Sequence, residues 1–149
     1  MRAFGSLVCG LLLLLLGAGA AADPRPLSSS ATYRLIAHPN NALGSVERRF
    51  VADAFLKKVT RWPSGEVIRP VDLTAGSSIR RSFCDEVLGR SVEAVKNYWQ
   101  QAIFSGRDVP PPELDAEDDV VRYVLKHPGA IGYVSTTVSL DGAKILTVR

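Results

Sequence analysis

The alternation of apolar and polar residues predicts a chain in which strands and helices follow one another. Residues 33–37 and 131–134 are short apolar runs bounded by turn-forming residues, a pattern typical of buried strands. Residues 66–71 and 144–148 predict two more strands by the same criteria. The sharpest boundary lies at residues 128–129, where a proline and a glycine end a helical pattern just before the second run.

Four segments between these strands carry apolar residues at helical spacing. Their expected N-cap residues are Ser45, Ser77, Ser91 and Asp115, and their expected ends lie at Trp62, Gly89, Gly106 and Pro128. The resulting order is strand, helix, strand, three helices and two strands. Such an order predicts an α/β fold, with a single open sheet covered by helices, over residues 32–149.

The N-terminal residues indicate export. Residues 1–22 combine an early arginine, a leucine-rich run and three final alanines, which is the pattern of a secretory signal peptide. The apolar run is shorter than the ~20 residues that a membrane-spanning helix needs. Residues 23–31 are rich in proline and serine and predict a flexible tether. We therefore expect no membrane span once the leader is removed.

Cysteine content and charge exclude several classes of protein. Removal of the leader leaves Cys84 as the one cysteine, so no internal disulfide forms, and an inert, half-buried thiol is expected. No spacing of histidine, cysteine and carboxylate residues indicates a metal site, and no cofactor is expected. The net charge is +3, and the basic residues are scattered among acidic ones. This pattern does not fit a nucleic-acid-binding surface.

The segment 74–78 is the candidate binding site. It joins a predicted strand to a predicted helix and contains Thr74, Gly76, Ser77 and Ser78. Free N–H groups at a helix start and nearby hydroxyls can bind an anion, and Arg80 or Arg81 could supply a countercharge. The simpler alternative is that Ser77 only caps the helix.

Other polar and aromatic residues favour structural roles. His38 and His127 each precede a proline at the end of an element and are expected in solvent-facing turns. Trp62 and Trp99 lie in or beside apolar stripes and are expected in the core. Because no paired acid and base or activated nucleophile is evident, the sequence does not favour an enzyme.

Four segments, taken in order, carry a resemblance to a known family: residues 38–41 (HPNN), 55–62 (FLKKVTRW), Gly76 and Ser77 with Phe83, and 128–134 (PGAIGYV). In order and spacing they resemble the substrate-binding proteins of phosphate ABC transporters, over about residues 34–148. The resemblance implies a periplasmic-binding-protein-like α/β fold and a periplasmic location. Members of that family have two such lobes and hold phosphate between them with amides, hydroxyls, an arginine and an aspartate. This chain resembles the second lobe only.

Two functional hypotheses follow from this resemblance. The first is a non-catalytic domain that binds phosphate or another small oxyanion, with an ABC transporter or an envelope protein as its partner. The second is a structural or interaction protein of the cell envelope whose ligand site has decayed. The second is motivated by positions 73, 75 and 79, where the family's arginine, aspartate and threonine are replaced by Leu73, Ala75 and Ile79.

Overall fold

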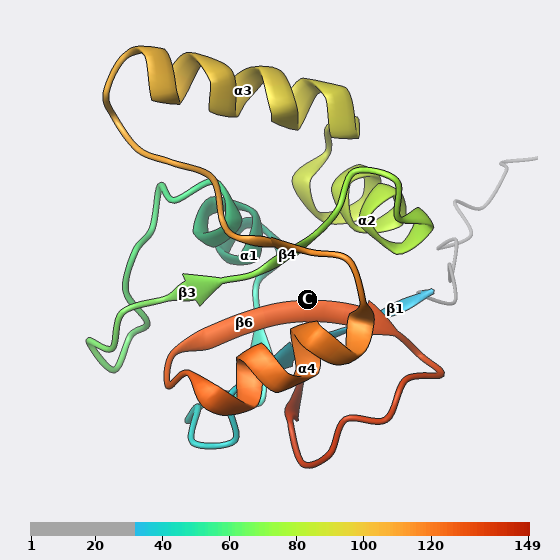
Figure 1. Ribbon diagram of the computed structural model, residues 1–149. Coiled ribbons are helices and arrows are strands. Elements are labelled where there is room, and N and C mark those ends of the chain that lie inside the picture. The colour runs from blue at the N-terminus through green and yellow to red at the C-terminus, as the bar shows by residue number, and fades with distance from the viewer. Residues whose placement is uncertain (1–31) are drawn as a thin grey trace, which may run out of the picture.

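The structure of the protein is a computed structural model, which describes residues 32–149 (Figure 1). The predicted leader and tether lie outside the described residues. The strands are β1 (Tyr33–Ala37), β2 (Ser45–Val46), β3 (Arg69–Pro70), β4 (Asp72–Leu73), β5 (Glu113–Leu114), β6 (Ala130–Ser135) and β7 (Lys144–Val148). The helices are α1 (Arg48–Phe55), α2 (Ser78–Phe83), the π-helical turn η1 (Cys84–Leu88), α3 (Val92–Phe104) and α4 (Glu117–Lys126).

Five strands form one open, mixed sheet in the order β2-β7-β1-β6-β3. The central strand β1 is antiparallel to both of its neighbours, with Leu35 opposite Tyr133 on β6 and opposite Leu146 on β7. The edge strands β2 and β3 are parallel to β7 and β6. Strands β4 and β5 form a separate parallel pair, in which Asp72 lies opposite Glu113. This small pair leads directly into the candidate site.

Alternation along β6 assigns the helices to the two faces of the sheet. Gly132 faces α4, since a Cβ built on it would lie 2.7 Å from a methyl carbon of Val120. Tyr133 faces the other way and stacks on Phe83 of α2 with ring centroids 3.9 Å apart. Phe55 of α1 packs on Phe83 at 4.7 Å. Helix α4 therefore covers one face, and α1 and α2 cover the other.

Helix α3 lies apart from the sheet, at the top of Figure 1. It packs on η1 through a small second core made of Cys84, Val95, Trp99 and Ala102. The Tyr98 hydroxyl also donates a hydrogen bond of 2.9 Å to the carbonyl of Leu56. The chain then returns from α3 to β5, beside the strand that precedes α2.

The α/β class is confirmed, with an open sheet and helices on both of its faces. The expected N-caps at Ser77 and Ser91 are also confirmed, because their hydroxyls accept hydrogen bonds from the amides of Arg80 and Ala94. Long-range pairing explains the strand that was missed at residues 113–114: β5 forms only because it meets β4.

Three boundaries were predicted wrongly. Ser45 does not cap a helix; it lies in β2 and pairs with Thr147 of β7. Helix α1 starts after Glu47, which makes no side-chain cap. Helix α1 ends at Phe55 and does not reach Trp62. Asp115 does not cap α4 either, because Ala116 occupies the N-cap position.

The strand expected over residues 66–71 is reduced to the two residues of β3, and the expected second helix is divided into α2 and η1. Gly89, at the end of η1, has a left-handed backbone with φ of 61°. Such a backbone favours glycine and terminates the helical segment. The predicted end at Gly89 is therefore confirmed.

Candidate functional site

The candidate site is the turn of residues 74–78, between β4 and α2. Ser77 has an extended backbone, and its hydroxyl accepts a hydrogen bond of 3.2 Å from the amide of Arg80. Its own amide donates to the carbonyl of Thr74 at 3.0 Å, which closes the turn. The structure therefore brings Thr74, Gly76, Ser77 and Ser78 together in one short loop.

This loop presents donors to solvent. Gly76 and Ser78 are exposed, whereas Thr74 and Ser77 are half-buried. The amides of Ser78 and Ile79 begin α2, where no preceding turn of helix supplies an acceptor. Hydroxyl and amide donors of this kind are able to coordinate the oxygens of a small anion.

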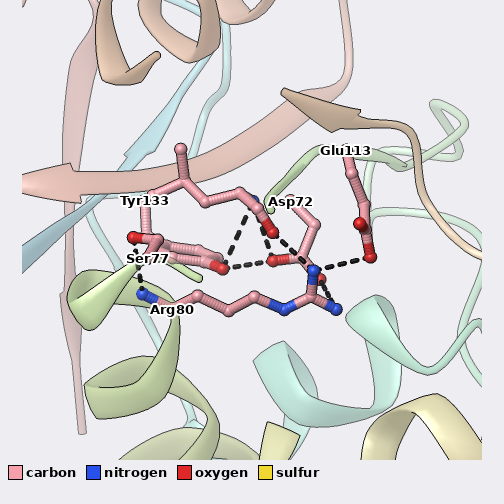
Figure 2. Close-up of polar contacts among 6 residues, drawn as sticks. Asp72, Ser77, Arg80, Glu113 and Tyr133 are labelled. Carbon is pink, nitrogen blue, oxygen red and sulfur yellow. Dashed lines mark hydrogen bonds and ion pairs between the residues drawn. The ribbon is translucent and has the colours of Figure 1, made fainter. Parts of the chain in front are cut away.

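Arg80 occupies a different position from the exposed donors. Figure 2 shows its side chain running away from Ser77 toward two carboxylates. One guanidinium nitrogen, Nη1, donates to the carbonyl of Leu73 at 2.5 Å and to Glu113 Oε1 at 2.6 Å. The other, Nη2, lies 3.3 Å from Asp72 Oδ2. Arg80 is only 3% exposed, and these two carboxylates balance its charge inside the protein.

Asp72 is the buried centre of this network. It is 5% exposed and accepts hydrogen bonds from the Tyr133 hydroxyl and from the amide of Leu73, the latter at 2.9 Å. Burial raises the pKa of Asp72 above its ordinary value, against the opposing effects of Arg80, Tyr133 and Leu73. Burial, and the nearby Asp72 carboxylate, also raise the pKa of Tyr133, which keeps its hydroxyl protonated as a donor.

The network fixes the start of the loop from three directions. Asp72 lies on β4, Glu113 on β5 and Tyr133 on β6, and the guanidinium of Arg80 joins the first two strands (Figure 2). Sequence reasoning missed Asp72, Glu113 and Tyr133. A carboxylate inside the apolar segment that leads to the loop was a usable signal for Asp72; no local signal pointed to Glu113, which follows three prolines.

The remaining sequence candidates take structural roles. Trp62 and Trp99 are 3% and 5% exposed, which confirms that they are core residues. Cys84 is completely buried, more so than expected, and burial raises the pKa of its thiol to about 11. Within residues 32–149, no group of three or more histidine, cysteine, aspartate or glutamate side chains is placed to hold a metal ion.

In the same part of the chain, no helix is long and apolar enough to cross a membrane. The predicted signal peptide over residues 1–22 and the tether over 23–31 stay predictions.

Comparison with known proteins gives a likeness of structure. No protein-family model and no curated protein matches the chain. A solved structure from Clostridium perfringens, described as a phosphate ABC transporter substrate-binding protein with bound phosphate, is 23% identical with a TM-score of 0.62. An ABC-type phosphate transport receptor from Vibrio cholerae is 15% identical with a TM-score of 0.60, and PstS from Borrelia burgdorferi is 12% identical with a TM-score of 0.61.

These matches cover 78–79% of this chain and only 44–47% of the similar chains. The resemblance found in the sequence is thereby confirmed as a likeness of fold. The chain has the α/β fold of phosphate ABC transporter substrate-binding proteins, over less than half of their length.

Proposed function

We propose that this protein is an exported, non-catalytic binding domain that holds phosphate or another small oxyanion at the 74–78 loop. The observation that carries the proposal is the exposed turn at the start of α2, where hydroxyl and amide donors converge without acceptors from the helix itself. The structural likeness to proteins that are named as phosphate-binding proteins supports the same choice of ligand.

Each loop residue has a distinct role in this proposal. Gly76 and Ser78 offer backbone amides, and Thr74 and Ser78 offer hydroxyl donors. Ser77 uses a lone pair to cap α2, so its hydroxyl proton remains available to a ligand. Arg80 acts from behind the loop, because its guanidinium fixes the carbonyl of Leu73 and is already balanced by carboxylates.

The expected affinity is low. One exposed turn covers a single side of an anion, and association itself opposes binding by at least about 4 kcal/mol. Hydrogen bonds to a charged group contribute about 1.5–3 kcal/mol each, so a few of them leave a small surplus. A dissociation constant of about 1 mM, which corresponds to about 4 kcal/mol, is the expected order of magnitude.

Calorimetric titration with phosphate and with sulfate, at low ionic strength, tests the proposal. We expect saturable binding that is lost in the double variant Ser77→Ala/Ser78→Ala. The matched control is Ser91→Ala, which removes the equivalent cap from α3, where the Ser91 hydroxyl accepts from Ala94 at 3.1 Å. Absence of binding by both anions, or equal loss in the control, would contradict an oxyanion site at the loop.

Export and partnership belong to the same proposal. Signal-peptide cleavage after Ala22 predicts a mature protein that begins at Asp23, which intact-mass measurement of the secreted protein would test. We place the protein in the periplasm, with a phosphate-type ABC transporter or an envelope protein as its partner. Mature protein retained in the cytoplasm would contradict this location.

A second candidate function is a structural or interaction protein of the cell envelope with a decayed ligand site. The balanced charge of Arg80 favours it, because a guanidinium already paired with Asp72 and Glu113 offers little attraction to an anion. This hypothesis predicts flat titrations with both anions and a stable complex in envelope fractions. A consistently monomeric native protein would count against it.

A further inference from the structure

A cavity of about 380 Å³ lies beside the 74–78 loop and under α3. Val92, Lys96, Trp99 and Ile103 recur at helical spacing and form one wall from α3. We call this cavity the α3 groove. Its volume falls in the range of small-molecule sites, about 300–1,000 Å³.

The opposite wall connects the groove to the candidate site. Ala75, inside the 74–78 loop, and Arg80 both line it. The chain that returns from α3 to β5 forms another side through Pro110 and Glu113, and this connection runs back below α3 in Figure 1. A ligand whose head group sits at the loop therefore has a cavity next to it.

Two positively charged side chains of the groove have unmatched donors, and Gln100, which also lines it, can donate or accept. The exposed side chain of Lys96 has no carboxylate or hydrogen-bond partner among the described residues. The Nε–H of Arg80 is buried without an acceptor in the same part of the chain. By contrast, Glu113, the acidic residue of the wall, already accepts from Arg80. Groups that need acceptors fit an anionic ligand.

Apart from Gln100, the rest of the wall is apolar. Trp99 contributes an aromatic ring that is almost buried, and Ile103 leaves 51% of its surface exposed at the rim. A bare phosphate ion has nothing to place against these side chains. An apolar substituent would instead remove their surface from water, and this favours binding in proportion to the area covered.

We propose that the α3 groove binds the apolar body of an organic oxyanion, a phosphomonoester or phosphonate with an aryl or alkyl substituent. This inference rests on the proposed oxyanion function: the 74–78 loop and Lys96 hold the charged head group. The substituent lies against Val92 and Ile103. The preferred ligand is thus an organic phosphorus oxyanion, and inorganic phosphate fills only the head-group part of the site.

Calorimetry with phenylphosphonate and with inorganic phosphate tests this inference on the full protein. We expect phenylphosphonate to bind at least ten-fold more tightly. Ile103→Ser should weaken the affinity for phenylphosphonate at least five-fold and change the affinity for inorganic phosphate less than two-fold. The matched control is Phe104→Ser, since Phe104 is 91% exposed on the same helix and does not line the groove. Lys96→Gln should weaken the binding of both ligands.

The outcomes separate this inference from the proposed function. If phosphate binds at the loop and phenylphosphonate binds no more tightly, the groove inference is overturned and the proposed function stands. If phenylphosphonate binding responds to Ile103→Ser but not to Ser77→Ala/Ser78→Ala, the groove holds the apolar substituent as inferred, and the assignment of the head group to the loop is wrong. Equal effects of Ile103→Ser and Phe104→Ser, or absence of binding by both ligands, overturn the groove inference.

Discussion

Replacing Arg80 with methionine should leave the Asp72 carboxylate inside the protein without its cation. Methionine keeps much of the length and the apolar stem of arginine but removes its contacts to Asp72, Glu113 and Leu73. The Glu113 side chain is 42% exposed and can be hydrated instead, whereas the Asp72 side chain is only 6% exposed. The penalty therefore falls on Asp72.

Removal of one partner from a buried ion pair destabilises a protein by about 3–5 kcal/mol. Because whole domains are stable by only about 5–15 kcal/mol, Arg80→Met should be close to unfolding. Urea denaturation followed by the fluorescence of Trp62 and Trp99 measures the loss. Arg81→Met is the matched control: Arg81 is exposed on the same helix, and its substitution should change the free energy of unfolding by less than about 0.5 kcal/mol.

The pH dependence of this loss has a definite sign. Burial raises the folded-state pKa of Asp72 above its ordinary value of 3.8, so the stability it contributes is complete below that value and is lost as the pH rises through the folded pKa. Arg80 opposes that rise, and its removal moves the folded pKa further upward. The deficit of Arg80→Met should thus be largest at neutral pH and shrink toward about pH 4.

A second variant tests the role of Asp72 even if Arg80→Met is poorly folded. Adding Asp72→Asn removes the unpaired buried charge, so the double variant should recover part of the lost stability. The interpretation fails if Arg80→Met behaves like Arg81→Met, if its deficit does not diminish in acid, or if the double variant recovers nothing.

Three further predictions concern the core. Gly132→Ala should destabilise the protein by about 1–3 kcal/mol in thermal denaturation, because the new Cβ would lie 2.7 and 2.9 Å from two valine methyl groups. The control Gly44→Ala should be nearly neutral, because a Cβ at Gly44 meets no atom within 4 Å. Cys84 is fully buried with a pKa of about 11, so a thiol reagent at pH 8 should react with it only after unfolding; rapid labelling of the native protein would contradict this. Trp62→Phe should lower the free energy of unfolding measured in urea by about 1–2 kcal/mol, because it removes the 3.0 Å hydrogen bond from the indole to the carbonyl of Gly129. An unchanged urea midpoint would show that this hydrogen bond does not stabilise the fold.

Local patterns predicted the elements whose boundaries are marked by neighbouring residues. The apolar stripe of α3 and its serine cap correctly predicted that the helix starts after Ser91. The apolar run after Gly129 correctly predicted β6. Ser45 misled the prediction because a serine before an apolar stripe is a good cap signal, yet its pairing with Thr147 is about a hundred residues away in sequence. No local pattern contains that information.

The candidate site divides in the same way. The 74–78 loop and the Ser77 cap were predictable, since both depend on neighbouring residues. The partners of Arg80 were not, because Glu113 reaches it only through the pairing of β4 with β5, and Tyr133 reaches Asp72 from β6. The sequence therefore suggested Arg80 or Arg81 as a countercharge for an anion and gave no sign of the carboxylates that pair with Arg80.

The balance of charge around the loop limits how an oxyanion can be held. Asp72 and Glu113 together outweigh Arg80 by one negative charge, so the buried network does not attract anions. Attraction must come from neutral donors of the turn, from the amides that open α2, and from Lys96 across the α3 groove. An anion bound mainly by neutral donors gains little from charge alone. A substituent that fills the groove adds favourable contact without any further charge, and this is why the geometry favours an organic oxyanion over a bare one.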